Sequence, residues 1–317
     1  MKTAYILIVL LALFSVQAAA QSLKTAEDYN NRGLERQGKG DIDGAIADYS
    51  QAVSLKAKAS TLATAYNNRA NARVAKNDLD GAVGDYSKAI ELQPNDEENY
   101  YNRGAARLAK GDNDGAITDF SRVIEMSPRF PLAYNNRGNA RRAKGDIDGA
   151  IADYSKALEQ NPRYTEAWYN RGAALQSKNN FDAAIRDYSF AIDLAPQFGD
   201  AYVNRGLAKQ AKRDFSGATA DFTEALKLKS DDAGIYFARA TARQEAKDLS
   251  GALADYSKVI EMDSTNAQAF ANRAVIEMLQ GNKTQGDRDF DQAFKLDPNL
   301  KPQFKEFIEG QRIRPNR

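Results

Sequence analysis

Side chains that could do chemistry recur along this chain at a nearly constant interval. An arginine followed by a small residue occurs eight times, and the interval between successive arginines is constant after a first one that is three positions longer. These arginines are Arg32, Arg69, Arg103, Arg137, Arg171, Arg205, Arg239 and Arg273. Aspartates before an aromatic residue repeat in the same register: Asp48, Asp85, Asp119, Asp153, Asp187, Asp221, Asp255 and Asp289. The spacing predicts either a row of ion pairs or, if the arginines were unpaired, a row that binds anions. Because every arginine has a matched aspartate, we expect the ion pairs.

An asparagine precedes the arginine in seven of the eight units. These asparagines are Asn31, Asn68, Asn102, Asn136, Asn170, Asn204 and Asn272, and Ala238 stands in their place in the seventh unit. A primary amide both donates and accepts hydrogen bonds, so such a row could pair with the peptide groups of a partner whatever its side chains are. The alternative is a structural role between neighbouring helical turns.

The composition excludes several classes of function. The chain has no His and no Cys, which removes histidine bases, thiolate nucleophiles, disulfides and the usual zinc ligands. Its 44 basic and 43 acidic residues give a net charge of +1, without the basic excess typical of nucleic-acid binding. We therefore expect no cofactor, no metal and no nucleic acid. A hydrolase or carbohydrate-active enzyme that uses carboxylates is a remote alternative, because the acids recur with the scaffold.

The elements that position these residues are predicted to be paired helices. A period of about 34 residues is typical of a solenoid of helix pairs. Aspartate or hydroxyl residues are expected to cap each second helix, and they are Asp43, Asp80, Asp114, Asp148, Asp182, Ser216, Ser250 and Thr284. One aromatic residue on each helix is expected in the core. On first helices these are Tyr29, Tyr66, Tyr100, Tyr134, Trp168, Tyr202, Tyr236 and Phe270. On second helices they are Tyr49, Tyr86, Phe120, Tyr154, Tyr188, Phe222, Tyr256 and Phe290.

The order of these positions resembles the tetratricopeptide repeat (TPR) family. The resemblance covers about 26–298 and rests on aromatic, small, small, aromatic and Pro positions that recur with this period. It implies an all-α, right-handed superhelical α-solenoid of eight helix-turn-helix repeats. The expected repeats are 26–62, 63–96, 97–130, 131–164, 165–198, 199–232, 233–266 and 267–300. A capping helix is expected over 301–312 and a disordered tail over 313–317.

The family resemblance also implies where a partner would bind. First helices line the concave face, which usually binds a peptide or a partner protein, and a comparable asparagine row elsewhere in the family grips an extended peptide. We expect the asparagine row to act with neighbouring residues of this groove, among which Tyr101 and Tyr169 are expected to be exposed. These neighbours are Asn67, Tyr101, Asn135, Tyr169 and Phe237. The predicted structural ion pairs are those of Arg103, Asp119, Arg137, Asp153, Arg171 and Asp187.

The segment 1–20 is predicted to be a secretory signal peptide. Lys2 precedes an uncharged, mostly apolar run over 4–16, and Ala18 and Ala20 form a small-residue cleavage site. The run is shorter than the roughly 20 residues of a membrane span, although an uncleaved anchor is the alternative. We therefore expect a secreted or periplasmic, non-enzymatic scaffold that binds a protein or peptide in its groove. The alternative is a structural or assembly factor that uses its convex face or edges.

Overall fold

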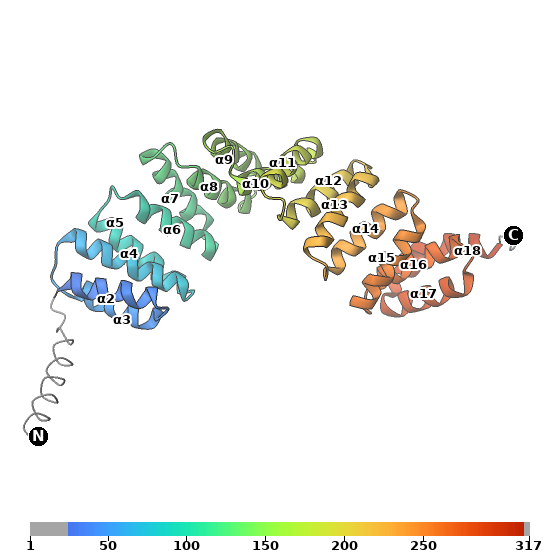
Figure 1. Cartoon of the computed structure of the whole chain (residues 1–317), viewed down its shortest axis with the longest axis horizontal. Helices are drawn as coiled ribbons and strands as arrows, with labels where there is room; N and C mark the ends of the chain where they lie inside the picture. Colours follow the sequence, from blue (N-terminus) through green and yellow to red (C-terminus); the bar gives the residue numbers. More distant parts are fainter. Residues whose placement is uncertain (1–24, 314–317) are drawn as a thin grey trace, which may run out of the picture. The chain divides into compact units, whose positions relative to one another are not determined.

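The computed structural model describes residues 25–313, and within them the chain contains helices and no strand. The predicted signal peptide lies outside these residues, as does all of the predicted tail except Ile313. Figure 1 shows successive helices arranged in antiparallel pairs. The prediction of an all-α solenoid of helix pairs is therefore confirmed. No helix in the described part of the chain has the length and apolar character that a membrane crossing requires.

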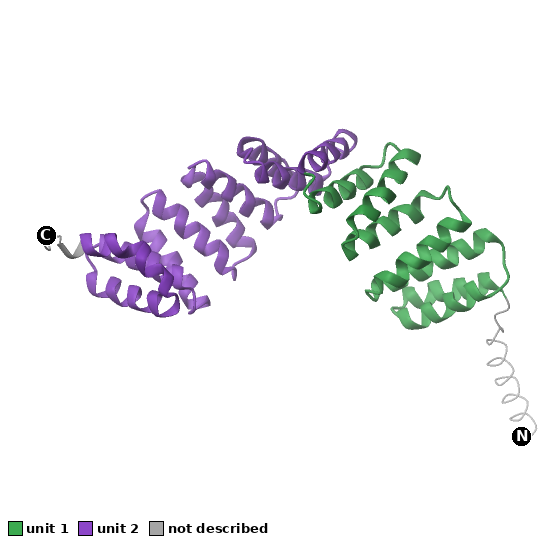
Figure 2. Cartoon of the chain, turned by 180° about the vertical axis from the view of Figure 1, so that it is seen from behind, with its two compact units in different colours: residues 1–146 green, residues 147–317 purple. Residues whose placement is uncertain are grey.

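The helices fall into two compact units, Met1–Asp146 and Ile147–Arg317 (Figure 2). Unit 1 contains α2 (Ala26–Gly38), α3 (Ile42–Ser54), α4 (Ala59–Ala75), α5 (Leu79–Leu92), α6 (Glu97–Lys110), α7 (Asn113–Met126) and α8 (Pro131–Ala143). Unit 2 begins with α9 (Ile147–Gln160), α10 (Thr165–Ser177), α11 (Phe181–Leu194), α12 (Gly199–Ala211) and α13 (Phe215–Leu228). It continues with α14 (Ala233–Glu245), α15 (Leu249–Met262), α16 (Ala267–Leu279), α17 (Lys283–Leu296), a short 3₁₀ turn η1 (Pro298–Leu300) and α18 (Lys301–Ile313). Even-numbered labels from α2 to α16 are the first helices of the eight repeats, and odd-numbered labels are the second helices.

The three additional residues between the first two repeats extend a helix. Helix α4 spans 17 residues, whereas most other first helices span 13. It begins at Ala59, four residues before the expected start of the second repeat at 63. The insertion therefore adds helical length at the start of the repeat and leaves the positions that follow in register.

The second helices are capped two residues earlier than the sequence predicted. Asp41 Oδ1 accepts a hydrogen bond of 2.9 Å from the backbone N–H of Gly44, so Asp43 lies inside the first turn of α3. The same cap recurs at Asp78, Asp112, Asp214 and Asp248. A Cβ on Gly44 would lie 2.1 Å from Asp41 Oδ2, so glycine lets the capping carboxylate approach. The predicted capping positions were therefore wrong in these five repeats, because a residue able to cap occurs at both places and only the earlier one precedes the glycine by three residues.

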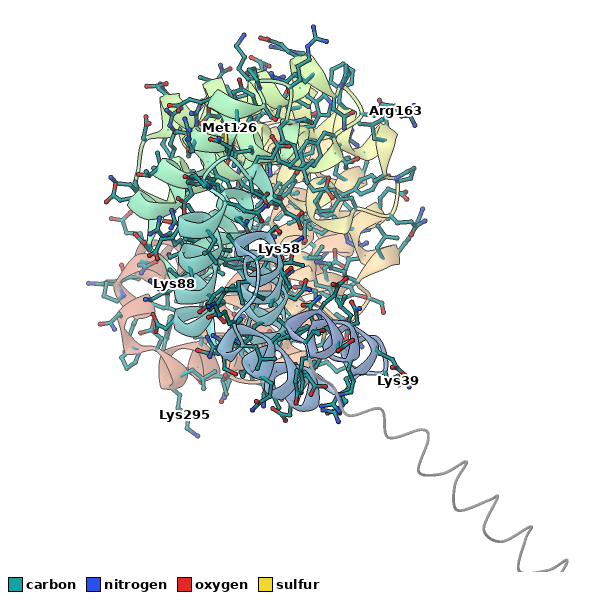
Figure 3. All side chains as sticks on the ribbon, turned by 90° about the vertical axis from the view of Figure 1, so that its left-hand side faces the viewer. Lys39, Lys58, Lys88, Met126, Arg163 and Lys295 are labelled. Atoms are coloured by element: carbon teal, nitrogen blue, oxygen red, sulfur yellow. The ribbon has the colours of Figure 1, made fainter. Side chains whose placement is uncertain are left out.

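The displaced acidic residues instead join neighbouring repeats. Asp43 pairs with Lys76, and Asp114 pairs with Lys144, in each case one repeat further along the chain. Equivalent pairs join Asp80 to Lys110, Asp148 to Lys178 and Asp182 to Lys212. These side chains are largely exposed, so each pair contributes under about 1 kcal/mol. Other charged side chains, among them Lys39, Lys88 and Lys295, extend away from the helices (Figure 3).

The core is built from the second-helix rings and the small residues of the first helices. All eight second-helix aromatic residues are buried. A Cβ on Gly172 would lie 2.9 Å from Cε1 of Tyr188, which shows how closely the ring approaches the first helix. The first-helix aromatic residues, by contrast, are only partly buried. The expectation that the rings belong to the core is confirmed for the second-helix set. Five first-helix rings are partly buried and pack against buried core clusters, namely Tyr29, Trp168, Tyr202, Tyr236 and Phe270.

The alkaline stability of the chain should depend on its buried tyrosines. Tyr49 is fully buried and donates a hydrogen bond of 2.9 Å to Gln37 Oε1. Burial raises the pKa of Tyr49 to about 12, from an ordinary value near 10. The folded state therefore keeps this proton where the unfolded state loses it, so stability is complete below about pH 10 and falls as the pH rises toward 12.

We expect Tyr49→Phe to lessen this alkaline loss. The measurement is urea unfolding at a series of pH values, with ultraviolet absorbance of tyrosinate recorded in parallel. Tyr66→Phe is the control, because this first-helix ring is only partly buried. If the Tyr49 hydroxyl ionises at the same pH as the exposed tyrosines, the proposed link between its burial and the stability of the chain is wrong.

Candidate functional site

The asparagine row lies on the first helices, on the surface that we call the first-helix face. Three of its members donate a hydrogen bond to the first helix of the preceding repeat. Asn68 Nδ2 donates to Asn30 Oδ1 at 2.9 Å. Asn136 and Asn204 donate to the hydroxyl oxygens of Tyr101 and Tyr169 at 3.0 and 2.8 Å. Within each unit, these asparagines therefore link adjacent first helices.

The other members of the row are placed differently. Asn31 is exposed and Asn102 is half-buried, and neither side-chain amide forms a hydrogen bond in the part of the chain described. Asn170 is half-buried on α10. Asn272 donates at 3.1 Å to the hydroxyl of Tyr256 and accepts from Gln268 at 2.9 Å. The row thus combines amides that join helices with amides that still face outward.

Several of the expected groove neighbours are more buried than the sequence suggested. Asn135 is only 4% exposed and donates at 3.3 Å to Asn136, so it is not a surface residue. Tyr101 and Tyr169 were expected to be exposed but are half-buried. Their rings lie 5.1 Å from Phe130 and 4.8 Å from Phe198, measured between centroids.

The two remaining groove candidates also make internal contacts. Asn67 Nδ2 donates to Asn99 Oδ1 at 2.6 Å, and its own oxygen accepts from Asn71 at 2.9 Å. The ring of Phe237 meets Tyr256 edge-on at 5.6 Å. Asn71 lies one turn from Asn67 in the same helix, whereas Asn99 lies in another helix. The ring contact of Phe237 with Tyr256 repeats the contacts of Tyr101 with Phe120 and of Tyr169 with Tyr188.

The arginine and aspartate rows meet within the repeats as forked ion pairs. In the third repeat, Arg103 Nε and Nη2 donate to the two carboxylate oxygens of Asp119 at 3.0 and 2.7 Å. Arg171 and Asp187 form the same fork, at 2.7 and 2.9 Å. The third predicted pair, Arg137 with Asp153, has one member in each of the two compact units. A guanidinium matches a carboxylate in this two-point geometry, which gives orientation as well as energy. The aspartate hydrogen bonds raise the pKa of Arg69 and Arg273, although burial opposes this shift.

A serine or threonine joins each arginine from Arg69 to Arg273 to the preceding repeat, a contact that the sequence did not predict. Arg103 Nη1 donates to Ser87 Oγ at 3.0 Å, while the Ser87 hydroxyl donates at 2.7 Å to the carbonyl of Val83 in its own helix. The arginine therefore binds one repeat through its fork and the previous repeat through its third nitrogen. The acceptors at the seven junctions within 25–313 are Ser50, Ser87, Ser121, Ser155, Ser189, Thr223 and Ser257. Their regular spacing, with the same longer first interval as in the arginine row, was the signal available in the sequence.

A second cation one turn further along the helix reaches the same carboxylate in several repeats. Arg107 Nη1 lies 2.8 Å from Asp119 Oδ2, and Lys209 Nζ lies 2.8 Å from Asp221 Oδ2. In the fifth repeat, Leu175 takes this place beside the Arg171–Asp187 pair. Most of these carboxylates are therefore surrounded by cations, a structural arrangement that leaves no exposed row of arginines for anions.

Each arginine also covers the aromatic ring of its own first helix. The guanidinium carbon lies between 4.8 Å (Arg171 over Trp168) and 5.6 Å (Arg103 over Tyr100) from the ring centroid, and all eight repeats share the contact. Such contacts stabilise by about 0.5–1 kcal/mol at exposed sites. The first-helix rings are thus shielded by a charged group, which explains why they need not be buried in apolar surroundings.

Family models match most of the chain. The description "Tetratricopeptide repeat" applies to the matches at 26–58, 165–198 and 203–267, and "TPR repeat" applies to those at 70–111, 106–141 and 138–179. The chain belongs to the tetratricopeptide repeat family. No curated protein matches the sequence.

Solved structures show the same fold. The chain is 27% identical to a MamA protein, with a TM-score of 0.50, over 54% of this chain and 94% of that one. It is 20% identical to the C-terminal part of a TPR repeat-containing protein from Cytophaga hutchinsonii, with a TM-score of 0.65. That match covers 74% of this chain and 97% of the other. YrrB, described as a TPR protein with an unusual peptide-binding site, is 24% identical to this chain, with a TM-score of 0.51. The match covers 62% of this chain and 97% of YrrB. The family generally forms non-catalytic scaffolds for protein interaction, and this chain has the architecture of such a scaffold.

Proposed function

We propose that the chain binds an extended segment of a partner protein along its first-helix face, outside the cytoplasm after removal of the predicted signal peptide. The observation that carries this proposal is the state of the amides in unit 1. Asn31 and Asn102 occupy the same register position on α2 and α6, and the rest of the described chain satisfies neither amide. Asn68 on α4, between them in the row, uses its Nδ2 internally at 2.9 Å.

These amides suit a peptide backbone better than a particular side chain. An amide that both donates and accepts can pair with one peptide N–H and one peptide C=O. One N–H of Asn68 is committed to Asn30, and its oxygen would accept from a peptide N–H. Asn204 in unit 2 likewise commits one N–H, to the Tyr169 hydroxyl at 2.8 Å, and its oxygen is available in the same way. The bonds inside the first-helix face fix the orientation of the amides before a partner arrives, which lowers the entropy lost on binding.

The test is a double substitution on the face. Peptides are first selected from a random phage-displayed library on the chain expressed as residues 21–317. We expect Asn31→Ala with Asn102→Ala to weaken the selected peptides by roughly 10- to 100-fold, because each lost hydrogen bond contributes about 0.5–1.5 kcal/mol. Fluorescence anisotropy measures the affinity. Circular dichroism should show an unchanged fold, since neither side-chain amide makes a hydrogen bond within the described part of the chain.

The control places two equivalent truncations on the second helices. Gln51 and Lys88 are exposed there, so Gln51→Ala with Lys88→Ala should leave peptide affinity unchanged. If this control loses binding while the asparagine variant keeps it, the partner binds the second-helix surface. That result would favour an assembly role over groove binding.

A further inference from the structure

The first-helix face of unit 2 contains a small cavity between α12 and α14. Its volume is about 240 Å³. It is lined by Asp200, Val203, Leu207, Lys229, Asp232, Gly234, Ile235 and Ala238. We call it the α12–α14 pocket. Small-molecule sites usually measure about 300–1,000 Å³, so this pocket has room for one side chain rather than for a metabolite.

The pocket exists because the seventh repeat departs from the others at two positions. Ala238 occupies the place of the asparagine found in the other seven repeats. Gly234 occupies a place that is filled elsewhere by Glu27, Thr64, Glu98, Leu132, Glu166, Asp200 and Gln268. A Cβ built on Gly234 would meet a single atom within 4 Å, Asp232 Oδ1 at 3.1 Å, so the space beside it is otherwise open.

The departure from the asparagine row is matched on the neighbouring helix. In the sixth repeat, Asn204 donates to the hydroxyl of Tyr169, one repeat earlier. The corresponding pair one repeat later is Ala238 with Val203, so donor and acceptor are both replaced by apolar groups. Replacing both partners of a hydrogen bond leaves no unsatisfied polar group. The apolar surface in this pocket is therefore a consistent local feature and not a single defect in the row.

The walls of the pocket are apolar and partly open to solvent. Ile235 is 4% exposed, while Leu207 is 39% exposed at the side of the cavity. An aliphatic side chain placed among Val203, Leu207 and Ile235 would lose water-exposed area on both sides of the contact. Burial of one such side chain favours binding by about 1.5–3 kcal/mol.

The rim carries one net negative charge. Lys229 Nζ lies 2.6 Å from Asp200 Oδ1, which neutralises that carboxylate. Asp232 Oδ1 accepts the backbone N–H groups of Gly234 and Ile235 at 2.9 and 3.2 Å. Asp232 forms no ion pair within residues 25–313, and its second oxygen accepts no hydrogen bond there. A cationic group of a ligand can therefore reach a carboxylate at the edge of an apolar cavity.

We propose that the α12–α14 pocket anchors an extended partner segment by one aliphatic side chain, with a Lys or Arg within two residues of it paired to Asp232. Alternate side chains of an extended chain point to the same side, so an anchor and a cation two residues apart would both face the protein. This inference rests on the proposed function and specifies which segment is bound. The asparagine amides bind the backbone of the partner segment, whereas this pocket binds one of its side chains and thereby selects a sequence.

The experiment uses the chain of residues 21–317 and the same random-peptide selection. We expect the selected peptides to be enriched in an aliphatic residue two residues from a basic one. Replacing that aliphatic residue by alanine in a fluorescein-labelled peptide should weaken binding at least tenfold. Ala238→Leu fills the pocket and should weaken the same peptide to a similar degree. Asp232→Asn keeps the capping oxygen and removes the charge. The variant should therefore no longer prefer peptides with the basic residue, and its peptide affinity should no longer depend on salt.

Two comparisons keep the proposal independent of folding and of the asparagine row. Leu207→Ser changes a half-exposed wall without adding volume, and it should weaken the peptide even if Ala238→Leu disturbs the helix pair. Selected peptides that bind Ala238→Leu and Leu207→Ser as tightly as the unaltered chain would overturn the pocket. If Asn31→Ala with Asn102→Ala still weakens those peptides, the proposed function stands without the pocket. If only the pocket variants weaken them, the pocket stands and backbone recognition by Asn31 and Asn102 fails.

Discussion

Replacing Asp119 with alanine is expected to lower the free energy of unfolding by about 3–5 kcal/mol, the range for breaking a buried ion pair from one side. The Asp119 side chain is 1% exposed and accepts from Arg103 at 3.0 and 2.7 Å and from Arg107 at 2.8 Å. Its removal leaves the half-buried Arg103 without a carboxylate partner and leaves Arg107 with Asp112 alone, whose Oδ2 lies 3.5 Å from Arg107 Nε. Urea unfolding followed by circular dichroism measures the loss, with the slope of the transition reporting any loss of cooperativity along the solenoid.

The matched control is an aspartate of the same unit that lies at the surface. Asp114 pairs with Lys144, and both side chains are largely exposed. Asp114→Ala should therefore cost under about 1 kcal/mol, because water and salt screen such a pair. Equal losses for the two variants would mean that burial does not govern the energy of these ion pairs.

Replacing Phe222 with alanine is expected to cost about 3–5 kcal/mol, the usual range for removing a buried aromatic side chain. The ring is fully buried on α13. It lies so near α12 that a Cβ on Gly206 would be 2.8 Å from its Cε1. The two backbones are held at this separation, so the structure cannot readily close over the cavity. Thermal and urea unfolding of the variant measure the loss.

Phe190 offers a phenylalanine control in the same unit. It is 50% exposed and stacks on Trp168 with ring centroids 4.5 Å apart. Phe190→Ala removes this stacking and little buried area, so we expect a loss of about 0.5–1.5 kcal/mol. A loss as large as that of Phe222→Ala would show that the exposed stack, and not the small-to-aromatic packing, holds the helices together.

The sequence predicted the helix pairs because their determinants are local and repeated. The constant repeat interval and the fixed offset between Arg103 and Asp119 placed both side chains in antiparallel helices that pack together. The burial of the second-helix rings followed from the small residues opposite them. No comparable signal distinguished the first-helix rings, whose partial exposure depends on the arginine that covers each of them.

The features that the sequence did not predict depend on choices between equivalent groups. Asp41 and Asp43 can both cap a helix, and the position of Gly44 decides between them. Ser87 has a hydroxyl that could serve many purposes, and only the folded geometry shows it between Val83 and Arg103. The asparagine amides were recognised as a row, but their division between internal links and outward-facing groups required the positions of the preceding helices.

The arginine-to-serine contact at the junctions makes neighbouring repeats interchangeable. Each of the seven junctions described is joined by an arginine of one repeat and a hydroxyl of the preceding one. A duplicated or deleted block of one whole repeat would bring the same donor to the same acceptor. The longer first junction shows that added helix before the arginine is tolerated too, because Arg69 still donates to Ser50 at 3.1 Å. Gene duplication can therefore change the length of the molecule without inventing a new interface. A distinctive repeat such as the seventh could then be moved along the array while its neighbours continue to fit.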